Sequence, residues 1–395
     1  MGALDGLKIL DFSTLLPGPF ATLMLADMGA EVLKISSKSK ADIVIDYPPF
    51  VADTGVSVNQ AWLGRNKKTM SLNLKEPKAI EIVKKLVLEY DIIMEQFRPG
   101  IMDKLGLGYE ALKAVNPNII YCSLTGYGQT GPLRNTAGHD INYLARSGNM
   151  AQAGRKSTGP VLTNMQIADV AVGSMNSVIG ILAAVNYRHS TGKGQYVDIS
   201  MYDGLIPFNS MDGAAFLATG REPKREGERL NGGCIYDFYE TKDGRHLSVG
   251  CLEPQFWENF CLCIGKPEYI KETVWPEKIE YIKDDIIDII KSKTLDQWID
   301  IFKGKDVCVE PVLSMKEALI EDEHIKSREM VVDVEMPLNN GGKVKQLATA
   351  IKLSECPPQY KHGGYPIGFH TKEILIQIGF SHEEIDCMKQ QGIFK

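Results

Sequence analysis

The stretch LKILDFSTLLPGPFATLMLADMGAEVLKIS, residues 7–36, decides the fold class of this chain. A short apolar run over 7–13 predicts a strand, the helical spacing of apolar residues over 19–30 predicts a helix, and 31–36 predicts a second strand. A strand, a helix and a strand in this order are typical of the first unit of a parallel α/β sheet. The turn at 13–20 then brings any ligand close to the carboxyl end of a strand.

The same alternation continues downstream and predicts a doubly wound α/β domain. The turn after the first strand contains neither the GxGxxG fingerprint nor a P-loop, so the sequence indicates neither a dinucleotide nor a nucleoside triphosphate as ligand. The further strand candidates lie at 69–74, 91–96, 118–126 and 195–201, and the helical patterns at 76–89 and 109–115.

A second, smaller domain is expected in the C-terminal half of the chain. The Gly-rich, charged stretch 212–233 reads as a linker, 235–250 as a hairpin, and 254–330 as mainly helical. Strand-like runs and two helices, at 371–378 and 382–390, follow. The predicted organisation is a large domain over 1–224, a small α+β domain over 225–330, and a segment over 331–395 that returns to the large domain.

Composition excludes several classes of function. The 395 residues carry a formal net charge of -6, and the basic residues are scattered, which argues against nucleic acid or an anionic membrane as partner. We expect no membrane span, because no apolar run has the required length, and no metal site, because the eight cysteines show no paired CxxC spacing. Reduced thiols and the absence of a signal-like N-terminus predict a cytoplasmic protein.

His139, in GHDINY (138–143), is the first candidate for chemistry. A single histidine among apolar residues is more often part of the core, but the flanking Gly138 and Gly148 allow close backbone approach, and Asp140 could tune the imidazole. Both interpretations, a core residue and a proton carrier, stay open on these residues alone.

Asp169 and Glu253 each stand where a helix is predicted to begin. Asp169 precedes a helical apolar pattern that a TGKG stop ends, and Glu253 precedes Pro254, which suits the first helical position. Helix capping explains both residues, at about 1 kcal/mol each. The same position would place a carboxylate beside amide groups that can hold an anionic oxygen, which suits acid/base chemistry.

Arg65 and Arg98 are candidates for binding a phosphate-rich ligand, because a planar guanidinium pairs well with phosphate oxygens. Taken singly, each is more often a surface or ion-pairing arginine.

Several longer motifs together resemble the family of class III CoA-transferases and α-methylacyl-CoA racemases (CaiB/BaiF type), nearly from end to end. The resemblance implies a CoA-binding α/β domain, a smaller domain, and an interlocked homodimer with active sites between the large domain of one subunit and the small domain of the other. It also implies that CoA enters as part of the substrate and that no prosthetic group is needed. The motifs are LDGLKILDFSTLLPGPFATLMLADMGAEVLKI, GRNKKTMSLNLK, FRPGIMDKLGLGYEAL, NIIYCSLTGYGQTGP, TGKGQYVDISMYDG and GFHTKEILIQIGFSHEEI.

GHDINY, IAD (167–169) and LEPQFW (252–257) are similar to the motifs of the racemase branch. By resemblance, His139, oriented by Glu253, exchanges the proton on one face of the carbon next to the thioester, and Asp169 serves the other face. Amide groups at the start of the helix that carries Asp169 would hold the enolate oxygen. A CoA-transferase, with Asp169 as nucleophile and His139 as a structural residue, is the alternative, and a non-catalytic CoA-binding paralogue is a third.

The resemblance also implies CoA contacts for Arg65 and Arg98. The acidic residue, proline and basic residue that the family usually shows after the second strand are replaced here by ISSKSKADIVIDYPP (35–49). Lys38 or Lys40 is the expected substitute for the missing cation.

Overall fold

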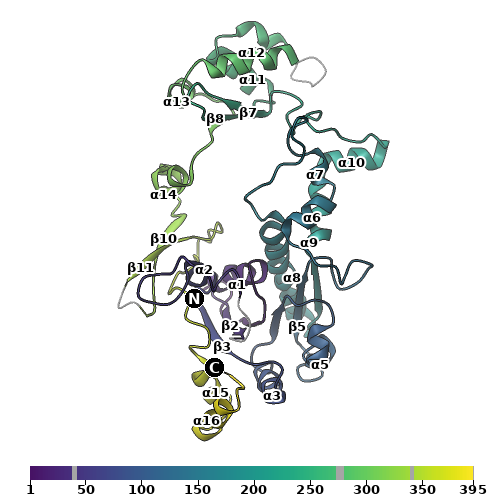
Figure 1. The fold of residues 1–395 in the computed structure, drawn as a ribbon, viewed down its shortest axis with the longest axis vertical. Helices are drawn as coiled ribbons and strands as arrows, with labels where there is room; N and C mark the ends of the chain where they lie inside the picture. The colour runs from purple at the N-terminus through teal and green to yellow at the C-terminus, as the bar shows by residue number, and fades with distance from the viewer. Residues whose placement is uncertain (38–41, 273–279, 339–341, 395) are drawn as a thin grey trace. The chain divides into compact units, whose positions relative to one another are not determined.

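The computed structural model describes residues 1–394, except 38–41, 273–279 and 339–341. The chain forms two compact units, of which the first contains residues 1–144, 165–206 and 323–395, and the second contains 145–164 and 207–322 (Figure 1). The boundaries thus differ from those expected at 224/225 and 330/331. The second unit also takes in 145–164, because Arg155 pairs with Asp237 and Arg225 donates to the carbonyl of Ala153.

A six-stranded sheet forms the centre of the first unit, in the order β3-β2-β1-β4-β5-β6, with every neighbouring pair parallel. This is the strand order of a doubly wound α/β domain, and the predicted fold class of this unit is confirmed. The strands are β1 (Lys8–Asp11), β2 (Glu31–Ser36), β3 (Lys67–Ser71), β4 (Ile92–Glu95), β5 (Ile120–Thr125) and β6 (Tyr196–Ser200).

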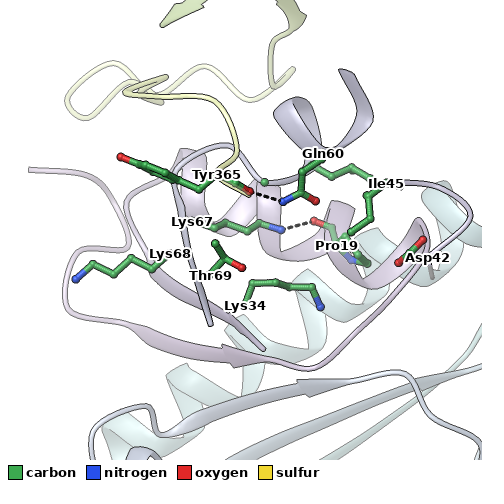
Figure 2. A pocket seen from close by; sticks show the side chains of 11 residues that line it. Pro19, Lys34, Asp42, Ile45, Gln60, Lys67, Lys68, Thr69 and Tyr365 are labelled. Carbon is green, nitrogen blue, oxygen red and sulfur yellow. Dashed lines mark hydrogen bonds between the residues drawn. The ribbon is translucent and has the colours of Figure 1, made fainter. Parts of the chain in front are cut away.

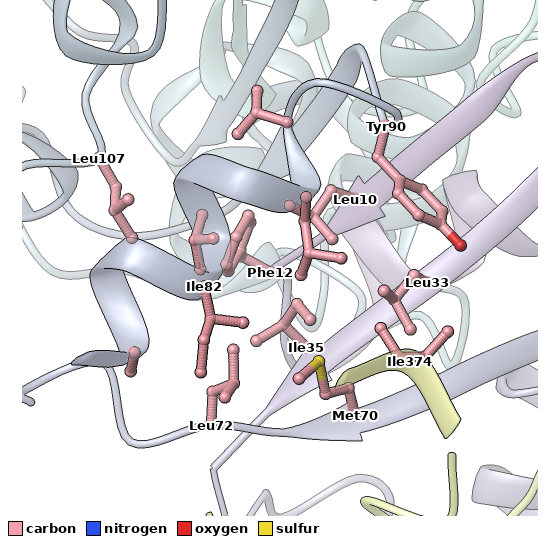
Figure 3. Packing of buried hydrophobic residues seen from close by; sticks show 14 of the residues in the cluster. Leu10, Phe12, Leu33, Ile35, Met70, Leu72, Ile82, Tyr90, Leu107 and Ile374 are labelled. Atoms are coloured by element: carbon pink, nitrogen blue, oxygen red, sulfur yellow. The ribbon is translucent and has the colours of Figure 1, made fainter. Parts of the chain in front are cut away.

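Helices cover the sheet, and most residues of its inner strands are apolar. All residues of β4 and β5 are buried, as expected for strands of a parallel sheet. On one face, Leu10, Leu33 and Ile35 pack together with Ile82 of α3 (Pro77–Leu86), and Ile374 of α15 (Thr371–Gln377) joins the same core (Figure 3). Elsewhere α1 (Pro17–Asp27) packs on α8 (Met175–Thr191), which contacts β5 and β6.

The remaining elements of the first unit are short. A hairpin, β10 with β11, belongs to the C-terminal segment, as do α15 and α16. The bounds are α2 (Val58–Leu63), α4 (Ile101–Lys104), α5 (Tyr109–Lys113), α6 (Asp140–Arg146), η1 (Ile167–Ser174), α9 (Met201–Leu205), α14 (Glu323–Ser327), β10 (Val331–Glu335), β11 (Lys343–Leu347) and α16 (His382–Gln390).

The π-helical turns of η1 run directly into α8, so the two form one helical segment over Ile167–Thr191. Among the described residues this is the single helix that is long and apolar enough to cross a membrane, with a mean hydropathy of 1.6 in its most apolar window. The sequence predicted a helix after Asp169, but the expectation that no apolar run has the length of a membrane span did not anticipate this segment. Because 44% of that window is buried in the chain itself and α8 packs on the sheet, the helix also fits the pattern of a core helix.

The second unit combines a three-stranded antiparallel sheet, in the order β7-β8-β9, with helices around its own apolar core. The predicted hairpin is confirmed as β7 and β8, whereas β9 falls in a stretch expected to be helical. Part of the predicted linker forms α10, which ends at Gly220. The elements are α7 (Asn149–Gln152), η2 (Ile206–Asn209), α10 (Ser210–Thr219), β7 (Asp237–Glu240), β8 (His246–Val249), α11 (Pro254–Cys263), η3 (Pro267–Lys271), α12 (Glu280–Lys291), α13 (Leu295–Phe302), β9 (Val309–Pro311) and η5 (Glu317–Glu321).

Candidate active site

A cavity of about 860 Å³ opens in the first unit beyond the carboxyl ends of its strands. The strand order reverses between β1 and β4, and doubly wound sheets bind ligands at this switch point. The walls come from segments that follow the strands, from the start of α6 and from η1. They include Phe12–Leu15, Lys34–Ser37, Leu72, Gln96–Pro99, Leu124–Tyr127, Gly138, His139, Tyr143, Asp169 and Met201.

His139 lies directly before α6 and is exposed toward this cavity. Its backbone N–H donates to Oδ1 of Asn142 at 3.0 Å, and its carbonyl accepts from the N–H of Asn142 at 2.8 Å. These two hydrogen bonds between His139 and Asn142 resemble a capping box and fix the backbone at His139. The imidazole takes no part in them. The interpretation of His139 as a buried core histidine is therefore wrong.

Asp169 lies in the first turn of the π-helical η1 and lines the same cavity. The prediction that Asp169 caps a helix is wrong, because Gln166 holds that position. The backbone N–H of Asp169 donates to Oδ1 of Asp140 at 3.1 Å, and the N–H of Ala168 donates to the same carboxylate. These two amides are thus already used, which contradicts the expectation that they hold an enolate oxygen. π-Helical turns often mark functional sites.

The charges around Asp169 tune its acidity toward neutral pH. Burial, and after it the negative charge of Asp140, raise the pKa of Asp169 to about 6, although His139 opposes the rise. Burial also raises the pKa of Asp140, against the effect of the two amides that it accepts. A carboxyl group that titrates near pH 6 can both accept and return a proton under physiological conditions. Asp140 thus acts on Asp169, although the sequence suggested an effect on His139.

Tyr143 packs beneath both candidate groups and explains two nearby glycines. Its hydroxyl donates to the carbonyl of Gly138 at 2.6 Å, and its ring packs edge-on against Tyr127. A Cβ atom at Gly138 would lie 2.7 Å from the Tyr143 ring, and one at Gly126 would lie 2.5 Å from its hydroxyl oxygen. Both glycines are therefore needed for close approach to this ring.

Glu253 belongs to the second unit, where it is exposed at the N-cap position of α11. Pro254 occupies the first helical position, as predicted, but the Glu253 side chain makes no capping hydrogen bond. Capping therefore does not explain this carboxylate.

Three cations line the cavity, and one of them was predicted. Arg98 follows β4 and is exposed, and no carboxylate pairs with it within the described part of the chain. Lys34 of β2 and Arg134 were not predicted, although a lysine inside the apolar run EVLKIS is itself a signal. Lys38 and Lys40, the expected substitutes, lie outside the described residues.

Arg65 has a different place from the one that the sequence suggested. It is 1% exposed, and its guanidinium donates to both carboxylate oxygens of Asp27, at 3.0 and 2.6 Å. It also donates to Oε1 of Gln346 at 2.9 Å and to the carbonyl of Leu347 at 3.0 Å, and it stacks on the ring of Tyr360. Arg65 joins the C-terminal segment to α1, so the expected CoA contact does not carry over to this residue.

A smaller pocket of about 20 Å³ adjoins the large cavity and shares Lys34, Asp42 and Ile45 with it (Figure 2). The ammonium group of Lys67 donates there to the carbonyl of Pro19 at 2.7 Å, and burial lowers the pKa of Lys67 to about 7. This volume holds little more than one water molecule, so the large cavity is the candidate substrate site.

Among the described residues, no group of three or more His, Cys, Asp or Glu side chains could hold a metal ion. All eight cysteines are free.

Comparisons with known proteins show which family the chain matches. The chain matches the model of CoA-transferase family III over residues 4–371. It is 34% identical over 399 residues to alpha-methylacyl-CoA racemase of Homo sapiens, with 100% of this chain and 98% of that protein covered. It is 32% identical over 384 residues to succinyl-CoA:glutarate CoA-transferase of Homo sapiens, with 95% and 86% covered. A crystal structure of a CAIB/BAIF family protein from Brucella suis superposes with a TM-score of 0.83 at 27% identity, over 95% of this chain and 99% of that chain.

Proposed function

The chain belongs to CoA-transferase family III, an enzyme family that acts on CoA thioesters, and we propose that it is an acyl-CoA racemase or epimerase. The reaction is inversion of the carbon next to the thioester in a 2-methyl or otherwise 2-substituted acyl-CoA. The similarity to the human racemase supports this choice, and the similarity to a CoA-transferase at nearly the same identity makes a site-based argument necessary.

One observation carries the proposal: His139 and Asp169 line one cavity from two different elements, and His139 is exposed in it. A CoA-transferase that uses Asp169 as nucleophile would leave His139 as a structural residue, and His139 is not packed as one. A two-base racemase needs one proton acceptor on each face of the reacting carbon, and an imidazole and a carboxyl group with a pKa of about 6 suit that task.

The reaction balances with a single shared proton. For one enantiomer, ionised Asp169 removes the proton from the carbon next to the thioester, the electron pair moves onto the thioester oxygen as an enolate, and protonated His139 delivers a proton to the opposite face. For the other enantiomer, neutral His139 removes the proton and protonated Asp169 delivers one. Each turnover inverts the two protonation states, and proton exchange of the two side chains with solvent, or turnover of a substrate of opposite hand, restores them.

CoA would be bound by the cations of the same cavity. Arg98, Lys34 and Arg134 place positive charge around a volume that suits a phosphate-bearing ligand. The cavity lining also contains Asp42, Asp46 and Asp169, so Arg98 and Arg134, the exposed cations, are the expected phosphate contacts, and the overall charge of -6 argues against nucleic acid as the ligand.

A homodimer is part of the proposal. Along α8, Met175, Ile179 and Tyr187 are 42%, 64% and 44% exposed, and contiguous exposed apolar groups mark protein contacts. The family resemblance implies that the small domain of one subunit completes the site of the other. Glu253, exposed and without a capping role, would then orient the imidazole of His139 in the partner subunit.

The test is NMR of a single enantiomer of a 2-methylacyl-CoA incubated with the protein in deuterated water without any acceptor acid. Deuterium at the carbon next to the thioester, together with loss of optical purity, is the expected result. No exchange, followed by CoA movement when a carboxylic acid is added and by hydroxylamine capture of an adduct at Asp169, would establish the CoA-transferase instead. Binding of CoA with neither reaction would point to a non-catalytic paralogue.

A further inference from the structure

A row of polar side chains crosses the sheet directly behind the cavity. Glu95 of β4 is in register with Ser123 of β5, which is in register with Asp198 of β6, so the three side chains share one face. Glu95 is 4% exposed and Ser123 is 1% exposed. A buried carboxyl group is costly unless it is hydrogen-bonded, so its bonds indicate its role.

The carboxylate of Glu95 is hydrogen-bonded to the turn that follows β4. Oε2 of Glu95 accepts the backbone N–H of Phe97 at 2.8 Å. On the other side, Glu95 is hydrogen-bonded by the hydroxyl of Ser123, whose oxygen accepts from the hydroxyl of Tyr196 at 2.9 Å. The donors thus run in one direction, from Tyr196 through Ser123 to Glu95, and leave the carboxylate as the acceptor that fixes Phe97.

This turn also forms part of the candidate binding site. Gln96, Phe97, Arg98 and Pro99 all line the large cavity. Oε1 of Gln96 accepts the N–H of Gly18 at 3.0 Å, which links the turn to the start of α1. Arg98 is close enough to the candidate catalytic groups that its charge lowers the pKa of Tyr143. Because Arg98 directly follows Phe97, its position depends on the hydrogen bonds that hold this turn.

We propose that Glu95 is a positioning residue: its buried carboxylate holds the turn at Phe97 so that Arg98 meets the acyl-CoA, and protonation of Glu95 releases that hold. The proposal rests on acyl-CoA binding in the large cavity, which is part of the proposed function, and does not depend on which reaction follows.

Glu95 changes its protonation state near neutral pH. Burial raises the pKa of Glu95, the bonds from Ser123 and Phe97 lower it, and the charges of Asp103 and Asp198 raise it, which together place it at about 7. The other titratable groups that face Glu95 stay neutral there, because burial raises the pKa of Tyr121, and raises those of Tyr196 and Cys122 to about 12. The carboxylate therefore holds Phe97 above about pH 7, and this hold is lost as pH falls.

The experiment compares wild-type protein with Glu95→Gln, which keeps the shape and one acceptor but cannot titrate. For wild type, the Kd of CoA by calorimetry and the KM of acyl-CoA are expected to rise about tenfold from pH 8 to pH 6, with kcat changing little. For Glu95→Gln, both constants should already be about tenfold higher at pH 8 and should show no further rise. Glu89→Gln, at a largely exposed glutamate that pairs with Lys8, is the matched control and should behave as wild type.

Two further variants extend the test, and one of them, Ser123→Ala, keeps the inference testable if Glu95→Gln does not fold. Ser123→Ala removes a bond that lowers the pKa of Glu95, so the midpoint of the Kd profile should move to higher pH. In an Arg98→Ala background, Glu95→Gln should add no further loss of affinity, because both changes act through one side chain.

The outcomes separate the two proposals. A Glu95→Gln protein whose Kd keeps the wild-type pH dependence, or one that loses kcat at unchanged Kd, overturns the positioning role. Failure of wild-type protein to bind CoA at any pH overturns the proposed function itself, while CoA binding without racemisation leaves the positioning role to be judged by the Kd profile.

Discussion

Replacing Asp140 by Asn tests how the charge next to Asp169 controls its acidity. Asparagine keeps an oxygen that can accept the amide hydrogens of Asp169 and Ala168, so the substitution removes the charge with little change of shape. The pKa of Asp169 is raised from 3.8 to about 6, with burial as the larger cause and the charge of Asp140 as the next. The charge of Asp140 therefore accounts for the smaller part of the rise in the pKa of Asp169.

The assay is the pH dependence of kcat/KM for α-proton exchange, measured separately from each enantiomer between pH 4.5 and 9. The acidic limb reports the protonation of Asp169, whose pKa is raised mainly by burial to about 6. In Asp140→Asn this limb is expected to move to lower pH by up to about one pH unit. Asp386→Asn is the control, because Asp386 is exposed on α16 and pairs only with an exposed Lys372.

An acidic limb that stays in place, with both variants equal to wild type, would refute the electrostatic argument. A shift of the acidic limb to higher pH would show a different main effect of the Asp140 charge. In that case its loss would act mainly by weakening the hydrogen bonds from the amides of Ala168 and Asp169, and this effect would outweigh the removal of a negative charge beside the Asp169 carboxyl group.

His139→Ala should slow exchange from one enantiomer far more than from the other, measured by chiral chromatography of the products, and equal residual rates would contradict two bases on opposite faces. Glu253→Gln should cost less activity than His139→Ala, because an orienting partner is less costly to lose than the proton carrier; equal losses would make Glu253 the proton carrier. Asp169 has a folded-state pKa raised above its ordinary value, so its ionised form costs stability once pH rises through about 6. Asp169→Asn should therefore raise the free energy of unfolding at pH 8 by about 1–2 kcal/mol, an effect that vanishes at pH 3.5 in urea titrations. Arg65→Ala leaves Asp27 buried and unpaired, so it should cost about 3–5 kcal/mol of unfolding free energy while KM of the folded fraction stays at the wild-type value.

Local pattern was enough to predict much of the large domain. The strand at 31–36 and the helix at 382–390 have the predicted bounds, because an apolar run between turn residues and a Ser-capped helix with Glu at its third position are short-range signals. The alternation of strands and helices also predicted the parallel sheet and placed the site at the carboxyl ends of the strands.

Features that depend on distant partners were not predictable in the same way. Asp169 lost its predicted capping role because Asp140, 29 residues earlier, satisfies the amides of that turn. The sequence suggested that Arg65 binds phosphate, because no residue near it in the sequence reveals its actual partners. One of these partners is Gln346, 281 residues later, which accepts a hydrogen bond from the Arg65 guanidinium. Residues 145–164 were assigned to the large domain because the ion pair between Arg155 and Asp237 spans 82 residues.

The buried position of Arg65 also sets the order of events during synthesis. Its partner Asp27 leaves the ribosome early, whereas Gln346 follows Arg65 by 281 residues, which takes about 15–60 s at ordinary elongation rates. The core of the first unit likewise waits for Ile374 and Leu375. During that interval the sheet of the growing chain exposes apolar surface. The pair of Arg65 and Asp27 also lacks its later partners, Gln346 and the carbonyl of Leu347. We therefore expect the sheet of the first unit to reach its full stability only after the segment that carries Gln346, Ile374 and Leu375 has been synthesised.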